Sequence, residues 1–178
     1  MIATGLFTST VIYCIQVFGN IWGLETHDET TRRFSSFTKE DCHKLQVLQN
    51  KVLKLQTGLP RDYPTNELIT QTGELSIHQM IAYHTLVQVH KTVITKKPKY
   101  LSDKLSPRVP GGVDMFPHRQ AFTITVNREL TISRVAFVYR GAKIWNQLPL
   151  NLRTCESSRM FKSQVKQWVK SNIGIKPP

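Results

Sequence analysis

The sequence predicts a mainly α-helical chain that ends in a small α+β basic region. Apolar residues recur every three to four positions in several segments, and capping and breaking residues bracket those segments. Near residues 122–126, apolar residues instead alternate with threonines, which is the period of a half-buried strand. The chain has 178 residues, 40% of them hydrophobic, so it can hold one or two small domains and is too apolar to be wholly disordered.

Charge is distributed unevenly along the chain. Lysine and arginine total 24 against 12 acidic residues, a net charge of +12. Residues 1–31 carry three acids and no base, residues 32–108 carry 13 bases and 6 acids, and residues 109–178 carry 11 bases and 3 acids. This balance argues against a generic acidic cytosolic enzyme and favours an anionic partner, with nucleic acid ahead of a membrane surface.

Residues 1–24 form an uncharged, apolar segment. We favour a buried helix of a larger domain, because polar residues such as Thr4, Gln16 and Asn20 interrupt the apolar run and are costly in lipid. The length still allows a membrane anchor, so that alternative stays open. A secretory signal needs an early basic residue and none precedes Arg32, so we expect a nuclear or cytoplasmic protein that is not secreted.

Three helices are expected next. Thr38 with two acids after it predicts a helix start, and Gly58 and Pro60 predict its end. A short helix is expected over residues 66–71 and a longer one over residues 77–95, capped by Ser76. In the first of these helices the expected buried stripe, at spacings of three and four, comprises Leu45, Leu48, Val52 and Leu55.

The second half begins with a proline- and glycine-rich segment, residues 102–119, which we expect to be a linker. It divides the chain into a helical region, residues 1–101, and a basic C-terminal region, residues 120–178. Short strands are expected near residues 120–139. The chain then finishes with a helix capped by Ser157 or Ser158, whose expected inner face comprises Phe161, Val165, Trp168 and Val169.

Two strings carry a resemblance to a known family. The first begins at Leu48-Gln49-Asn50-Lys51 and includes Thr57-Gly58-Leu59-Pro60-Arg61. The second begins at Phe137-Val138 and includes Tyr139-Arg140-Gly141-Ala142-Lys143-Ile144-Trp145-Asn146-Gln147-Leu148-Pro149. Together they resemble the C-terminal part of reverse transcriptases encoded by non-LTR retrotransposons of the jockey-like kind. Residues 6–23 resemble the helix that precedes this part. The resemblance implies a thumb-like helical region over residues 1–101, followed by a basic tail.

The resemblance does not extend to catalytic chemistry. Polymerases of this family depend on an aromatic-x-Asp-Asp turn whose aspartates hold two metal ions, and no such string occurs in this sequence. We therefore expect no enzymatic activity from this chain alone, no cofactor and no metal. His78, His84 and His90 lie six residues apart, about 240° around a helix, so a shared metal site is not expected. Cys155 is expected to be a bystander thiol, because no catalytic partner is near in sequence.

Basic and aromatic residues remain as candidates for binding nucleic acid. Lysine and arginine neutralise phosphates, and exposed aromatic rings stack on unpaired bases. The alternatives are that Tyr139 and Trp145 belong to a small core, and that the lysines of the last helix only form a solvated face. The candidate residues are Arg134, Tyr139, Arg140, Lys143, Lys162, Lys166 and Lys170.

The expected function is that of a non-catalytic C-terminal fragment of a retrotransposon RNA-directed DNA polymerase. It would bind RNA or single-stranded DNA by the backbone, with weak sequence specificity, beside the rest of the polymerase if that is present. The alternatives are a pseudogene product with no retained activity and a membrane-associated protein that uses residues 1–24.

Overall fold

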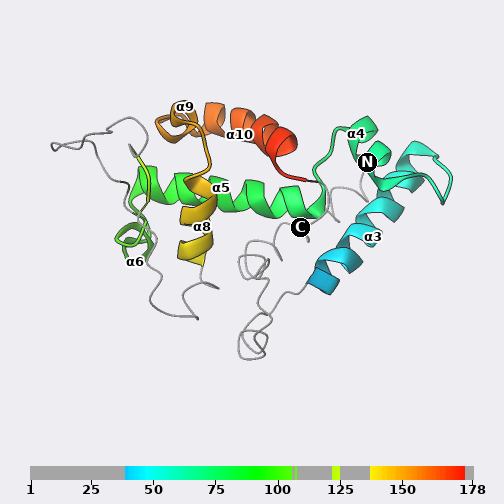
Figure 1. Ribbon diagram of the computed structural model, residues 1–178, viewed down its shortest axis with the longest axis horizontal. Coiled ribbons are helices and arrows are strands. Elements are labelled where there is room, and N and C mark those ends of the chain that lie inside the picture. Colours follow the sequence, from blue (N-terminus) through cyan, green and yellow to red (C-terminus); the bar gives the residue numbers. More distant parts are fainter. Residues whose placement is uncertain (1–38, 106, 108–121, 125–136, 175–178) are drawn as a thin grey trace.

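The computed structural model describes residues 39–105, 107, 122–124 and 137–174, and these residues are mainly helical, as predicted (Figure 1). The predicted apolar helix at residues 1–24 and most of the predicted linker lie outside the described residues. Within the described residues there is no strand, and the one β-type contact is an isolated antiparallel bridge between Pro107 and Ile124. The helices described are α3 (Lys39–Thr57), α4 (Thr65–Thr72), α5 (Ile77–Thr95), α6 (Lys99–Ser102), α8 (Phe137–Trp145), α9 (Leu150–Arg153) and α10 (Ser158–Asn172).

Helix α3 ends where the sequence predicted, but it buries a partly different face. Gly58 takes the left-handed conformation, with φ +68°, which a glycine adopts without steric cost. The buried residues are Cys42, Gln49 and Leu53, whereas two members of the predicted stripe are exposed, Leu48 at 47% and Leu55 at 85%. The other two members, Leu45 and Val52, are half-buried, and Leu45 packs against the core, so the predicted stripe coincides with the buried face only in part.

Two glutamines explain which face of α3 turns inward. The Gln46 side chain accepts a hydrogen bond from the backbone N–H of Ile77 at 2.8 Å, and the Gln49 side chain donates to the carbonyl of Leu75 at 2.8 Å. Both bonds satisfy backbone groups at the start of α5, which would otherwise be buried without partners. The spacing of apolar residues carries no information on these hydrogen bonds. A prediction from that spacing alone therefore placed the buried stripe next to the face that is buried.

Helix α5 is the central element, and α3, α6, α8 and α10 all contact it (Figure 1). Its start is fixed by a capping box: Ser76 accepts from the backbone N–H of Gln79, and the Gln79 side chain accepts from the backbone N–H of Ser76. It has no acidic residue, and most of its side chains are buried or half-buried. A helix apolar on this many sides needs partners around it.

Helix α10 covers one side of α5 and runs antiparallel to it (Figure 1). Phe161, Val165 and Val169 have no exposed area, as predicted for the inner face. The Gln79 side chain at the start of α5 donates to the carbonyl of Ile173 just beyond α10, at 2.8 Å. Of the two caps predicted, Ser157 is the one used, since its hydroxyl accepts from the backbone N–H of Met160.

Helices α6, α8 and α9 were not predicted, and residues 137–139, where strands were expected, are helical. Helix α8 crosses α5 at a glycine, Gly141, where a Cβ would lie only 2.7 Å from the Val89 side chain (Figure 1). The core therefore joins residues from both sides of the predicted linker, including Leu86, Val89, Trp145 and Phe161. The division into two regions stays a prediction.

Replacing Gly141 by alanine tests this close approach. In an open helix interior the change would stabilise by about 1 kcal/mol. Here we expect a loss of about 1–3 kcal/mol in the free energy of unfolding, because the added methyl group collides with Val89. Urea unfolding measures the loss, and Lys143→Ala on the exposed face of α8 serves as the matched control.

A double-mutant cycle completes the test. Val89→Ala should cost less in the Gly141→Ala background than in the wild type, because it removes the methyl group that is struck. Additive costs, or a stabilised Gly141→Ala protein, would contradict the close approach.

Candidate nucleic-acid interface

Part of the predicted interface is used for packing. Trp145 has no exposed area, and Tyr139 and Arg140 are half-buried on α8. Burial lowers the pKa of Arg140 to about 10, so its guanidinium is still charged at neutral pH but stands partly out of water. Lys143 is exposed, and Arg134 lies outside the described residues. The predicted group around Tyr139 therefore offers one exposed cation, Lys143, among its described members.

The end of α8 holds an extended segment in place. Asn146 pairs with both backbone groups of Ile124: Ile124 N–H donates to Oδ1 at 2.9 Å, and Nδ2 donates to the Ile124 carbonyl at 2.9 Å. Trp145 Nε1 donates to the carbonyl of Phe122 at 3.0 Å. Phe122 has a φ of +57°, a left-handed conformation that is unfavourable for any residue other than glycine. Contacts such as these are needed to hold it there. The Trp-Asn pair of the second string is thus a structural tether.

The predicted lysines of α10 lie on its outer face and are exposed to solvent. Lys162, Lys166 and Lys170 are all exposed, one turn apart. Arg159, also exposed, extends this row to spacings of three, four and four; it was not among the predicted residues, although the same spacing reveals it. We call these four residues the α10 basic row. Helix α10 contains no acidic residue to neutralise them.

Lys170 has a structural contact that the other members lack. Its Nζ donates a short hydrogen bond to the carbonyl of Gly73, at the C-terminal end of α4. A lysine at a helix C-terminus is favoured by the helix dipole. An ammonium group has three donors, so this bond does not prevent contact with a phosphate. Replacing Lys170 would nevertheless disturb the fold as well as any binding.

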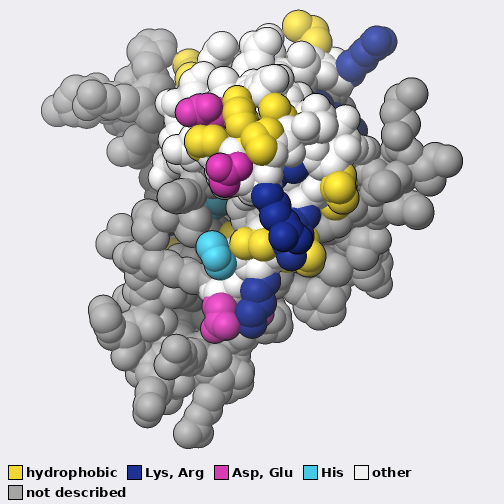
Figure 2. Space-filling model, turned by 90° about the vertical axis from the view of Figure 1, so that its right-hand side faces the viewer, with side chains coloured by type: hydrophobic (Ala, Val, Ile, Leu, Met, Phe, Trp, Pro, Cys, Tyr) yellow, Lys and Arg dark blue, Asp and Glu magenta, His cyan; other side chains and the backbone are white. Residues whose placement is uncertain are grey.

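Charge differs sharply between the two ends of the described structure. Residues 39–74, which include α3 and α4, hold five bases and five acids, a net charge of zero. The described residues from 75 onward hold twelve bases and two acids, a net charge of +10. On the face at the α3–α4 end, basic, acidic and hydrophobic side chains are interspersed (Figure 2). The excess positive charge belongs to α5, α6, α8, α9 and α10 and the segments that join them.

The three histidines of α5 lie in different surroundings. The rings of His90 and Phe161 stack with centroids 3.9 Å apart, and His90 Nε2 lies 2.7 Å from the Cys155 carbonyl, to which it must donate. Burial lowers the pKa of His78, His84 and His90, and Lys162 lowers that of His84 further. Among the described residues, no three acid, histidine or cysteine side chains are grouped so as to hold a metal ion.

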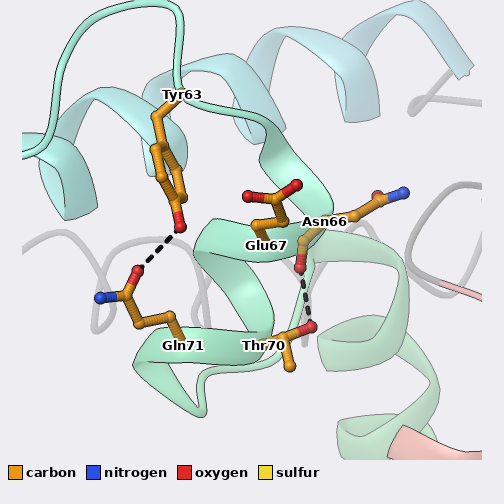
Figure 3. A pocket seen from close by; sticks show the side chains of 5 residues that line it. All are labelled: Tyr63, Asn66, Glu67, Thr70 and Gln71. Atoms are coloured by element: carbon orange, nitrogen blue, oxygen red, sulfur yellow. Dashed lines mark hydrogen bonds between the residues drawn. The ribbon is translucent and has the colours of Figure 1, made fainter.

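The described part of the chain has a shallow pocket of about 450 Å³ beside α4, lined by Tyr63, Asn66, Glu67, Thr70 and Gln71 (Figure 3). Tyr63 Oη donates to Gln71 Oε1 at 3.2 Å, and Thr70 Oγ1 donates to the Asn66 carbonyl at 2.8 Å. Glu67 is the one carboxylate in the lining, Tyr63 contributes a phenol, and no histidine or cysteine belongs to the lining.

The two described cysteines, Cys42 and Cys155, differ in burial. Burial raises the pKa of Cys42 to about 11, so it stays protonated at neutral pH. Cys155 is half-buried, and its sulfur lies 3.5 Å from the carbonyl of Ser157.

Comparison with known proteins found no match to a family model, a curated protein or a solved structure. Within the described ranges, none of the helices combines the length and the apolar character needed to cross a membrane. Function must therefore be inferred from the side chains and their charges.

Replacing Asn146 by alanine should cost about 1–3 kcal/mol of unfolding free energy, because both backbone groups of Ile124 lose their partner. The adjacent exposed residue supplies a matched control, since Gln147→Ala should change stability by less than about 0.5 kcal/mol. Equal stabilities of the two variants in urea unfolding would show that the tether contributes nothing.

The lowered histidine pKa values predict loss of stability in acid. An unfolded histidine protonates near pH 6.5, whereas the folded histidines of α5 protonate only at lower pH. Between these values the unfolded state binds more protons, so the free energy of unfolding should fall as pH falls below about 6.5. Urea unfolding at pH 7.5 and pH 5 measures this, and His90→Gln should flatten the dependence, whereas Gln164→Ala should not.

Proposed function

We propose that this chain is a non-catalytic nucleic-acid-binding module that holds RNA or single-stranded DNA by its phosphates. The α10 basic row carries the proposal: four exposed cations lie along one side of a helix that has no acidic residue. Such a row meets the main requirement of sequence-independent binding, which is neutralised phosphate charge. The net charge of +10 on the described residues from 75 onward supports it, because the whole region attracts a polyanion.

The dimensions of the row suit a polynucleotide strand. Arg159 and Lys170 are eleven residues apart, and at about 1.5 Å per residue the row is about 16 Å long. A stacked strand places one phosphate about every 3.4 Å along its axis, so about four or five phosphates could lie along it. The row offers no pattern of amide or bidentate groups for reading bases, so we expect weak sequence preference.

The parent of this module, in our proposal, is the RNA-directed DNA polymerase of a non-LTR retrotransposon. The resemblance of the 57–61 and 139–149 strings supports this, and with it a nuclear or cytoplasmic location and a small α+β content in residues 120–178. In this proposal the rest of the polymerase would be the partner that meets the exposed Leu48 and Leu55 on α3. The membrane alternative depends on residues 1–24, which lie outside the described residues, and the exposed leucines suit a pseudogene product as well.

A salt titration tests the proposal. Replacing Arg159, Lys162 and Lys166 by glutamine should reduce the slope of log affinity against log salt by about two, because each lost phosphate contact removes about 0.7 for a single strand. Lys170 is left unchanged because it holds the end of α4. Fluorescence anisotropy of a labelled, unstructured RNA measures affinity and slope together.

The matched control removes the same charge from the electroneutral end. Lys44, Lys51 and Arg61 are exposed on α3 and the loop after it, and their replacement by glutamine should leave the slope within about 0.5 of the wild type. Equal slopes for the wild type and the α10 variant would mean that the row only keeps the helix soluble. An equal effect of both variants would mean that net charge, and not the row, determines binding.

A further inference from the structure

One aromatic side chain in the described residues is exposed while the others are buried or half-buried. Tyr100, on α6, is 69% exposed, whereas Trp145 is fully buried and Tyr139 half-buried. Helix α6 is anchored by its neighbours, since Ser102 is 7% exposed and Leu105 fully buried. The same turn that buries these two residues directs Tyr100 outward. Tyr100 therefore contributes little to the core, and its ring is free to meet a ligand.

Lysines surround this tyrosine in sequence. Lys96, Lys97, Lys99 and Lys104 are all exposed, and Asp103 is the one acid in residues 75–105. Lys96 has a φ of +55°, a left-handed conformation that glycine or asparagine would adopt at lower cost. Lys96 thus places a charged side chain at a position whose backbone conformation is most easily adopted by glycine. We call Tyr100 and these four lysines the α6 cluster.

The α6 cluster lies at the same end of the molecule as the start of the α10 basic row. Helices α5 and α10 are antiparallel, and the ring of His90 near the end of α5 stacks on that of Phe161 in the first turns of α10 (Figure 1). Lys96 follows the last turn of α5, and Arg159 opens α10. The α10 basic row and the α6 cluster therefore lie toward the same end of α5, on opposite sides of that helix (Figure 1).

We propose that Tyr100 is a stacking platform for an unpaired base of single-stranded RNA or DNA, with the lysines beside it holding the adjacent phosphates. Stacking on an aromatic ring tolerates any base, because every base has a π face, and it requires that the base be unpaired. The α6 cluster would thus supply what the α10 basic row lacks, which is a preference for single strands over duplex. This inference rests on the proposed function and adds a second site to it.

The test separates stacking from charge. Tyr100→Leu removes the ring and no charge, so affinity for an unstructured RNA of about 20 nucleotides should fall by about fivefold or more while the salt slope stays the same. Tyr100→Phe keeps the ring and should bind like the wild type. Affinity for a duplex of the same length should be unchanged in both variants. Because Tyr100 is exposed, thermal unfolding should show that all three proteins are equally stable.

Several results would overturn the inference. If Tyr100→Leu binds single strands like the wild type while the α10 variant loses salt slope, the stacking platform is wrong and the proposed function stands. If the wild type does not bind RNA at all, both are wrong. Vesicles containing anionic lipid form a separate arm: if Tyr100→Leu loses vesicle binding but keeps its RNA affinity, the cluster binds a membrane surface and not a base.

Discussion

The structure depends on the burial of α5. This helix carries a net charge of +1, with Lys91 as its one charged residue, and it is buried or half-buried along most of its length. Such a helix is stable in water only when other helices cover it, and α3, α8 and α10 each do so by a different device. Helix α3 supplies glutamine hydrogen bonds to its start, α8 approaches closely at Gly141, and α10 contributes a row of apolar side chains. The α10 basic row is thus the outer side of a helix whose inner side is committed to covering α5.

The features that neighbouring residues determine, such as helix ends and the inner face of α10, could be predicted from the sequence. Capping and breaking residues placed α4, α5 and α10 closely, and the inner face of α10 follows from its apolar spacing. The sequence could not show which face of α3 turns inward, because two glutamine side chains decide it through bonds to residues about thirty positions away. Helix α8 is not predicted for a similar reason: the sequence predicts strands as far as residue 139, and Gly141 acts through its fit against Val89, which is distant in sequence.

The residues around Tyr139 are weaker binding candidates than the sequence suggests, because most of them are used for packing. Within the string at residues 139–149, Gly141 permits close packing, Trp145 and Asn146 hold residues 122–124, and Leu148 is buried. A segment that carries this many structural contacts has few side chains left for a ligand. The sequence left open whether Tyr139 and Trp145 face a ligand or a small core, and the structure buries Trp145. Exposure, which only the structure supplies, keeps the predicted lysines of α10 as candidates and adds Arg159 and Tyr100 to them.

The outer face of α10 is informative because stability does not dictate its charge. Phe161, Val165 and Val169 supply the packing of this helix, and within the α10 basic row only Lys170 has a structural bond, to the Gly73 carbonyl. The other exposed positions could hold acids, amides or a mixture of charges at no cost to the core. Like charges three or four positions apart repel by about 0.2–0.5 kcal/mol per pair, and no acid in the helix offsets this. A mixed row would be as soluble and more stable. An anionic partner removes the repulsion on binding, and a polynucleotide supplies its charges at a spacing that a helical row can match.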